Sequence, residues 1–343
     1  MPATIPAPAF PDQREGDFTV RDFRFQRGEV LPEVRLHCTT LGSPVRDQAG
    51  RVANAVLLLH GTTGTGKSYL APSLAGELFG PGQVLDASRW FVILPDGLGR
   101  GGSSKPSDGL RARFPRYGYG DVVAAQHLLV TRHLGVDHLR AVVGTSMGGM
   151  QTWLWGERYP DMMDALMPIA SQPIQISGRN LLWRRIITEA IRSDPDWNGG
   201  DYRAQPWRWH KVLPLFAIMA GSAVRLQAQA PTRAAADALY EELANPPGGT
   251  LDANDYLYWL ESSWDYDPEP DLGKIQARLV AVNFADDLIN PADLGVMERL
   301  VPEVRNGSLV VVPAGARTAG HATLTLAALW KPHLEALLRA TAR

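Results

Sequence analysis

The fold is decided by the stretch Leu139-Arg140-Ala141-Val142-Val143-Gly144-Thr145-Ser146-Met147-Gly148-Gly149-Met150. Its apolar run, Ala141 to Val143, predicts a buried strand, and the spacing G-x-S-x-G follows that run directly. In such a motif the serine lies on a sharp turn from strand into helix, and the flanking glycines leave room for the backbone. Ser146 would then be exposed beside the N–H groups of the next helix, as a nucleophile requires. An ordinary glycine-rich turn has the same pattern, so the rest of the chain must decide.

The composition is that of an ordinary globular protein with room for one large α/β domain or two smaller ones. The chain has 343 residues, of which 45% are hydrophobic and 20% charged, and its formal net charge is -2. This charge gives no basic surface for nucleic acid or for an anionic membrane, so neither is expected as a partner. Cys38 is the only cysteine, which excludes an intrachain disulfide and favours a buried structural thiol.

Neither a membrane span nor a secretion signal is indicated by the sequence. Its apolar runs stay short of the roughly 18 residues that a transmembrane helix needs. The N-terminus lacks a basic segment followed by an apolar one. We therefore expect a cytoplasmic protein.

Strand and helix patterns alternate along most of the chain, which predicts an α/β fold with a mostly parallel central sheet and helices on both faces. Strands are expected at Phe18–Phe25, Val34–Thr40, Ala55–His60, Trp90–Leu94, Ala141–Val143, Ala165–Ala170, Ala277–Phe284 and Ser308–Val312, and helices at Tyr119–Leu134 and Leu324–Leu338. The strand signal disappears from about Ser171 to Asp267, where helical patterns and six of the ten tryptophans occur. The predicted organisation is a core of residues 1–171 and 268–343 with an inserted helical cap of residues 172–267, and residues 1–16 are expected to form a flexible arm.

Two chemistries compete for the segment after the Ala55–His60 strand. Gly61-Thr62-Thr63-Gly64-Thr65-Gly66-Lys67-Ser68 fits the P-loop pattern G-x-x-x-x-G-K-[ST], which would make the protein a nucleotide hydrolase. The same position is where an α/β-hydrolase carries its oxyanion loop, with the N–H of Thr62 facing the site. The second interpretation is favoured because it also uses Ser146. A glycine-rich loop, Asp96 to Ser104, follows the next strand and is expected at the same edge.

Ser146, Asp286 and His321 follow predicted strands in the order typical of the α/β-hydrolase fold. A serine hydroxyl is a weak nucleophile, so an imidazole must accept its proton and a carboxylate must orient that imidazole. The backbone N–H groups of Thr62 and Met147 would stabilise the oxyanion. These residues predict an acyl-serine intermediate, with no cofactor and no metal.

The sequence resembles the homoserine O-acetyltransferases and their esterase relatives among the α/β-hydrolases. The resemblance rests on Val143–Gln151, on Asp194–Tyr202 in the cap, on Ala285–Pro291 and on Gly320-His321. It implies that Asp286 is the acid of the triad, that the substrate is a small-molecule ester and that the protein is a homodimer.

Two departures from this family concern the substrate. Ala322 follows the histidine where the acetyltransferases have an aspartate for the homoserine amine, and Leu215–Met219 lacks their arginine for the carboxylate. Without these charges an amino acid would be bound with unpaired ions. The expected function is therefore a serine carboxylic ester hydrolase for short, uncharged, acetyl-type esters. The alternative is an O-acyltransferase from acetyl-CoA to an alcohol or amino acid such as homoserine, and a binding protein on an inactive hydrolase fold stays open.

Overall fold

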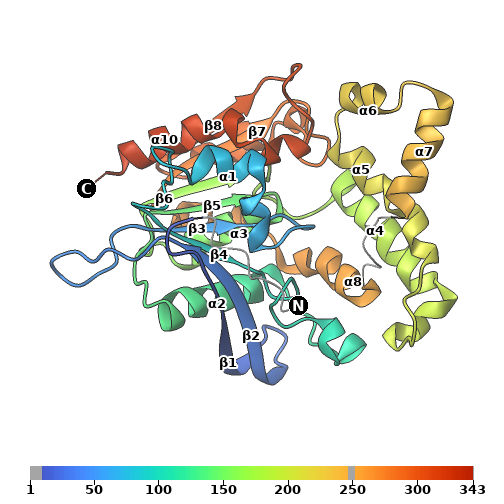
Figure 1. Ribbon diagram of the computed structural model, residues 1–343, viewed down its shortest axis with the longest axis horizontal. Helices are drawn as coiled ribbons and strands as arrows, with labels where there is room; N and C mark the ends of the chain where they lie inside the picture. The colour runs from blue at the N-terminus through green and yellow to red at the C-terminus, as the bar shows by residue number, and fades with distance from the viewer. Residues whose placement is uncertain (1–9, 246–251, 343) are drawn as a thin grey trace, which may run out of the picture.

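The computed structural model describes residues 10–245 and 252–342, which form one eight-stranded sheet with helices on both of its faces (Figure 1). The strands are β1 (Arg14–Arg24), β2 (Val30–Leu41), β3 (Ala55–Leu59), β4 (Phe91–Pro95), β5 (Ala141–Thr145), β6 (Ala165–Ile169), β7 (Arg278–Phe284) and β8 (Gly307–Val312). Their order in the sheet is β1-β2-β4-β3-β5-β6-β7-β8. The pairs from β4 to β8 are parallel, whereas β2 is antiparallel to both β1 and β4.

Each face of the central strands is covered by its own set of helices. On one face, α2 (Tyr119–Leu128), α3 (Met147–Arg158) and α9 (Val296–Leu300) pack in a single apolar cluster. On the other face, α1 (Pro72–Leu78) and α10 (Lys331–Ala340) form the second cluster. Every residue of β3, β5 and β6 is buried, as a strand covered on both faces requires. The predicted fold class is confirmed.

The N-terminal strand begins earlier than the composition suggests. β1 starts at Arg14, which pairs with Thr40 of β2, so residues 14–16 are part of the sheet and not of a flexible arm. Backbone pairing with β2 holds these residues although Arg14 and Glu15 are charged and Gly16 has no side chain. Residues 1–9 of the expected arm lie outside the described part of the chain.

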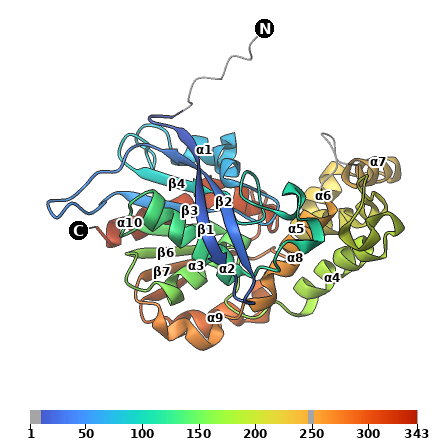
Figure 2. The same cartoon turned by 90° about the horizontal axis from the view of Figure 1, so that it is seen from below.

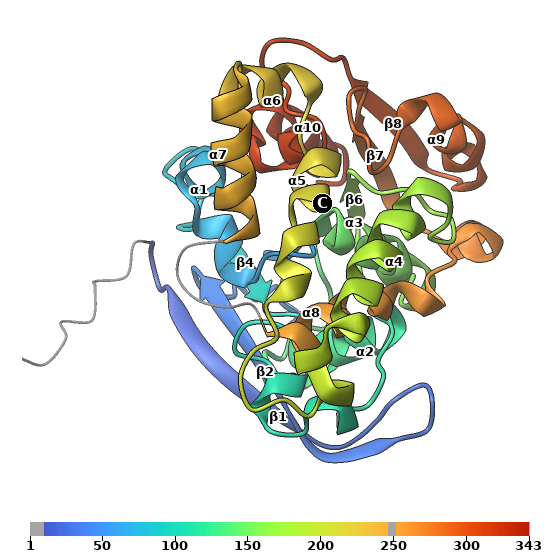
Figure 3. The same ribbon diagram turned by 90° about the vertical axis from the view of Figure 1, so that its right-hand side faces the viewer.

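Among the described residues between β6 and β7, five α-helices lie to one side of the sheet in two perpendicular views (Figures 1 and 2). They are α4 (Gly178–Ser193), α5 (Pro214–Ala220), α6 (Ala223–Gln229), α7 (Arg233–Ala244) and α8 (Ala253–Glu261), and Figure 3 shows them facing the viewer. They have an apolar cluster of their own, in which Trp183, Trp209 and Tyr256 are buried. Trp207 and Trp264 are about half exposed, so the tryptophans of this segment do not share one function.

Two predicted helices are divided in the structure. The helical pattern of residues 119–134 is α2 followed by a π-helical turn, Leu129–His133. The pattern from Leu324 becomes two 3-10 turns before α10, because Pro332 is tolerated only in the first turn of a helix. Among the described residues, none of the helices combines the length and the apolar character that crossing a membrane would require.

Candidate active site

Ser146 lies at the junction of β5 and α3 with a backbone that few side chains adopt. Its φ and ψ are 54° and -114°, and its own N–H donates to the carbonyl of Ile169. A Cβ at Gly144 would lie 2.0 Å from the carbonyl oxygen of Gly148, and a Cβ at Gly148 would lie 2.0 Å from that of Leu59. Both glycines of G-x-S-x-G are therefore required by close backbone contacts, and the turn leaves the hydroxyl at the carboxyl edge of the sheet.

His321 reaches Ser146 from the loop after β8. Its Nε2 lies 2.8 Å from Oγ of Ser146, and its Nδ1 lies 2.7 Å from Oδ2 of Asp287. The imidazole is nearly buried and the carboxylate of Asp287 is completely buried. An ionised carboxylate only accepts hydrogen bonds, so Nδ1 carries the proton and Nε2 is free to accept the hydroxyl proton of Ser146.

The acid in contact with His321 is Asp287, so the prediction of Asp286 is wrong by one residue. After β7 the chain turns, with the N–H of Asp287 donating to the carbonyl of Phe284, and this turn directs residue 287 inward. Oδ1 of Asp287 accepts hydrogen bonds from two backbone N–H groups, those of Ile289 and Asn290. Nothing in the sequence distinguishes the two adjacent aspartates, because the turn geometry alone decides which one faces the histidine.

Asp286 holds the loop that carries the histidine. Its Oδ2 accepts hydrogen bonds from the hydroxyl of Thr318, at 2.9 Å, and from the N–H of Gly320, at 3.0 Å. Asp286 therefore does not contact the imidazole, which Asp287 does, but it fixes the backbone of the loop just before His321.

The loop after β3 lies against Ser146. A Cβ at Gly61 would lie 3.5 Å from Cβ of Ser146, and the next residue, Thr62, is buried. Within the described residues, the N–H of Thr62 donates no hydrogen bond. Met147 is the first residue of α3, where an N–H has no acceptor within the helix. Thr62 and Met147 therefore each have an unpaired N–H group: Met147 follows Ser146 directly, and Thr62 follows Gly61, which lies against Ser146.

A model of the alpha/beta hydrolase fold matches residues 54–315. The chain belongs to the α/β-hydrolase fold family. A homoserine O-acetyltransferase of Thermobifida fusca is 38% identical over 59% of this chain and 58% of its own length. A homoserine O-succinyltransferase of Magnetococcus marinus is 32% identical over 74% of this chain and 73% of its own. The protein is thus an enzyme of the homoserine O-acetyltransferase-like group of α/β-hydrolases.

Solved structures with this fold include both transferases and hydrolases. A homoserine O-acetyltransferase from Bacillus anthracis has a TM-score of 0.82 at 21% identity, covering 95% of this chain and 97% of that one. An acetylester hydrolase from Corynebacterium glutamicum has a TM-score of 0.81 at 22% identity, covering 95% and 96%. At these identities the likeness establishes the fold alone.

The P-loop pattern of this α/β-hydrolase does not form a phosphate cradle. A P-loop turns its backbone N–H groups toward the phosphates. Here those of Gly64, Thr65 and Gly66 donate instead to Gly61, to the hydroxyl of Ser68 and to the carboxylate of Asp96. Lys67 is half exposed and forms an ion pair with Glu15. The pattern is therefore a coincidence of sequence.

His60 and Arg100, for which the sequence predicted no role of their own, hold the loop that follows β3 in this α/β-hydrolase. Nε2 of His60 accepts a hydrogen bond from the N–H of Gly97, while its Nδ1 faces the carbonyl of Gly61. Burial and, to a lesser degree, the charge of Arg100 lower the pKa of His60 to about 4, so the imidazole is neutral. Arg100 donates to the carbonyls of Thr62 and Gly64. The only sequence signal for Arg100 was its place in the glycine-rich loop.

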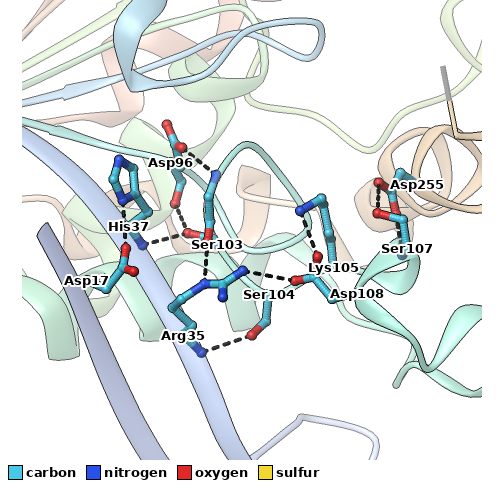
Figure 4. Close-up of polar contacts among 11 residues, drawn as sticks. Asp17, Arg35, His37, Asp96, Ser103, Ser104, Lys105, Ser107, Asp108 and Asp255 are labelled. Atoms are coloured by element: carbon cyan, nitrogen blue, oxygen red, sulfur yellow. Dashed lines mark hydrogen bonds and ion pairs between the residues drawn. The ribbon is translucent and has the colours of Figure 1, made fainter. Parts of the chain in front are cut away.

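That glycine-rich loop is fixed on two sides (Figure 4). The carboxylate of Asp96 accepts from the N–H of Gly102, and Nε of Arg35 on β2 donates to the carbonyl of Gly102. Just beyond the loop, Ser107 donates both its N–H and its hydroxyl to the carboxylate of Asp255 in α8. The loop and the residues that follow it thus link the sheet to α8.

Metal ligands do not gather at this site. In residues 10–245 and 252–342, no three histidine, cysteine or acidic side chains lie close enough together to hold a metal ion. Cys38 is buried in β2, and burial raises the pKa of its thiol to about 12.

Proposed function

We propose that the protein is an O-acyltransferase that moves a short acyl group to an alcohol oxygen through an acyl-Ser146 intermediate. The observation that carries the proposal is the hydrogen-bonded chain Ser146, His321 and Asp287, with distances of 2.8 and 2.7 Å. The direction toward transfer comes from the relatives that are named homoserine O-acetyltransferase and O-succinyltransferase. Acyl transfer, the alternative in the sequence analysis, is therefore favoured over ester hydrolysis.

In the first half of the reaction Oγ of Ser146 attacks the carbonyl carbon of an acyl ester or thioester. The hydroxyl proton passes to Nε2 of His321, and the resulting imidazolium is stabilised by the buried carboxylate of Asp287. The negative charge on the carbonyl oxygen is accepted by the N–H groups of Thr62 and Met147. When the tetrahedral intermediate collapses, the bond to the leaving group breaks and His321 returns the proton to it.

In the second half an acceptor hydroxyl attacks the acyl-serine. His321 removes the proton from that hydroxyl, the new ester bond forms, and the proton returns to Oγ of Ser146 as the acyl–serine bond breaks. Water could attack the same carbonyl carbon, so the acceptor must occupy the site faster than water. The distinction between transferase and hydrolase is therefore a property of the acceptor site and not of the triad.

The second candidate is a carboxylic ester hydrolase for short, uncharged esters. Ala322 is the specific observation in its favour, since a methyl group next to His321 offers no charge to an acceptor amine. The acetylester hydrolase from Corynebacterium glutamicum shows that this fold is also found in a hydrolase.

One experiment tests the intermediate and then separates the two candidates. A fluorophosphonate probe should label the wild-type protein at Ser146, and Ser146→Ala should abolish labelling and lower kcat on p-nitrophenyl acetate by about 10⁴- to 10⁶-fold. Acetyl-CoA is then supplied with and without homoserine or a simple alcohol. Acceptor-dependent ester formation supports transfer, release of acetate regardless of acceptor supports hydrolysis, and the absence of labelling rejects both.

A further inference from the structure

A cavity of about 650 Å³ lies between the cap and the core. The helices α4 and α8, which pack against each other, form its cap side (Figure 3), and the turn between β1 and β2 and the chain before α2 form its core side. Its volume is within the range of about 300 to 1,000 Å³ that is typical of sites for small molecules. None of its described lining residues lies in the loops after β3, β5, β7 or β8, which carry Thr62 and the triad. The cavity is therefore a site separate from the triad.

Arginine side chains dominate the charged lining of this cavity. It includes five arginines and one acidic residue, which are Arg27, Arg116, Arg184, Arg185, Arg192 and Glu261. The whole chain has a formal net charge of -2, so the positive charge is confined to this part of the molecule. Like charges around one cavity repel one another, and the repulsion lowers stability unless an anion balances it.

The acidic side chains nearby balance only part of this charge. Glu261 is shared between two arginines, Arg116 at 2.7 Å and Arg192. Arg185 forms an ion pair with Glu189 on the same helix, but both side chains are more than half exposed, so solvent weakens the attraction. Two carboxylates thus serve three arginines of the cavity.

The other two arginines, Arg27 and Arg184, have no acidic partner. In the part of the chain that the structure describes, no carboxylate lies within ion-pair distance of either guanidinium. Arg184 is only 3% exposed, and its Nε and Nη1 donate to the side-chain oxygen of Asn180 and to the carbonyl of Leu260. Both acceptors are neutral. A buried guanidinium without a counter-charge favours an anion beside it.

Two of the guanidinium groups are held flat against aromatic rings at the cavity. The guanidinium carbon of Arg27 lies 4.5 Å from the ring centre of Trp264, and that of Arg116 lies 4.1 Å from the ring centre of Tyr258. A stacked guanidinium keeps its in-plane N–H groups for other partners. Arg27 is exposed and the side chain of Arg116 is about one third exposed, so both have surface from which to meet a ligand.

The arrangement of the donors suits phosphate better than carboxylate. Arginines reach the cavity from both the cap and the core, so their donors do not share one plane. A carboxylate has two oxygens in one plane, whereas a phosphate offers three oxygens in different directions. Ser177, which precedes α4 and makes no capping hydrogen bond, also lines the cavity and brings the positive end of that helix to it.

We propose that this cavity binds a small molecule with two or more phosphate groups, which is not the acyl donor, and that the bound ligand joins the cap to the turn between β1 and β2. Arg27 and Arg116 contribute from the core side, and Arg184 and Arg185 contribute from α4. The proposal goes beyond acyl transfer and does not depend on it.

Binding is tested first on the wild-type protein, with tripolyphosphate as the probe. Titration calorimetry compares tripolyphosphate with citrate, a small polyanion that has only carboxylates, and sodium chloride keeps the ionic strength equal. We expect a Kd below about 0.1 mM for tripolyphosphate and a Kd at least about tenfold higher for citrate, since several charged hydrogen bonds contribute.

Two variants and a matched control assign the binding to the cavity. Arg27→Gln breaks no ion pair among the described residues, and Arg185→Gln breaks one exposed pair, so both should fold. Each should raise the Kd of tripolyphosphate about tenfold, and the double variant about a hundredfold. Arg111→Gln is the control, because Arg111 also lies over an aromatic ring, that of Tyr202, but outside the cavity. It removes the same charge and should leave the Kd unchanged within about twofold.

A third measurement separates the cavity from the acyl site. Saturating acetyl-CoA should not displace tripolyphosphate, and saturating tripolyphosphate should not prevent fluorophosphonate labelling at Ser146. Five results would overturn the proposal: no binding to the wild type, equal affinity for citrate, an unchanged Kd in the double variant, an equal loss in Arg111→Gln, or displacement by acetyl-CoA. The wild-type titrations hold even if a variant does not fold. Absence of labelling at Ser146 without tripolyphosphate rejects the proposed function and leaves the binding result unaffected.

Discussion

Ser146 and the pair His321 and Asp287 meet at the same edge of the sheet, but they are positioned by different means. Ser146 is placed by backbone geometry, since β5 ends, the chain turns at φ 54° and the positions of Gly144 and Gly148 leave no space for a Cβ. The histidine and the acid lie in loops after β8 and β7, where side-chain hydrogen bonds hold them. Asp286 supports one of these loops and Asp287 contacts the ring.

The difference shows which parts of such a site tolerate substitution. Where backbone contacts fix a residue, a substitution that adds atoms destabilises the fold, because a carbonyl oxygen can move only if its whole strand moves. Where side-chain hydrogen bonds fix a residue, a substitution that removes the acceptor releases that residue, and the surrounding fold is retained. Substitutions on the two sides of the site should therefore affect different measured quantities.

The largest effect expected from this comparison is at Asp287. Asp287→Asn removes the charge that stabilises the imidazolium and can reverse the tautomer of His321, so kcat should fall by about 10⁴-fold. Asp286→Asn keeps an oxygen for Thr318 or Gly320 and loses no charge next to the ring, so the decrease should be about tenfold or less. Steady-state rates on p-nitrophenyl acetate measure both.

Thermal unfolding accompanies these rates, and the two variants serve as controls for each other. Both should unfold within a few degrees of the wild type, since neither adds volume. A larger loss of rate in Asp286→Asn than in Asp287→Asn would contradict the assignment of the acid.

The next effect is on stability and concerns the nucleophile side. Gly144→Ala places a Cβ about 2.0 Å from a backbone oxygen and should lower the free energy of unfolding by about 3 kcal/mol. Gly76→Ala is the control, because Gly76 lies within α1 and its Cβ would meet nothing within 4 Å. It should stabilise the protein by up to about 1 kcal/mol. Urea unfolding measures both, and equal values would show that space around Ser146 is not limiting.

The same contrast explains what could be predicted from the sequence. Two local sequence patterns were enough to predict the fold class and the contact of Ser146 with His321. They are the glycines around Ser146 and the alternation of apolar strands with helices. The choice between Asp286 and Asp287 depends on the direction of a loop turn, and both are aspartates at the end of one strand. A pattern in one sequence does not predict the direction of that turn.

Arg100 and the P-loop pattern show two further limits. The sequence Gly61–Ser68 has the residues of a phosphate cradle, but its N–H groups are consumed by Asp96 and Ser68, which only the folded chain brings near. Arg100 reaches Thr62 across 38 residues of sequence, and its guanidinium lies over the ring of Trp259 from α8. Both features depend on contacts between distant segments, and their effects were not visible in local periodicity.

The smallest predicted effect is the dependence of stability on pH, and it concerns His60. This residue is buried, as the turn at Ser146 is, and it holds its neighbours through a side-chain hydrogen bond, as Asp286 and Asp287 do. Its Nε2 accepts the hydrogen bond from the N–H of Gly97. Burial, followed by the nearby charge of Arg100, lowers its pKa from 6.5 to about 4. Between these values the unfolded chain binds a proton that the folded chain does not, so stability is lost as the pH falls from about 6.5 to 4.

His60→Gln should remove this dependence. At pH 7.5 the variant should be less stable than the wild type by about 1 to 2 kcal/mol, because the contacts of the imidazole with Gly97 and Gly61 are lost. At pH 4.5 the difference should vanish or reverse, because the wild-type protein alone loses up to about 3 kcal/mol through the lowered pKa. Other groups titrate in both proteins, so their contributions cancel in the difference in stability between the wild type and the variant. Urea unfolding at several pH values measures this difference. Parallel stability curves would mean that the protonation of His60 is the same in the folded and the unfolded chain, which would contradict the lowered pKa.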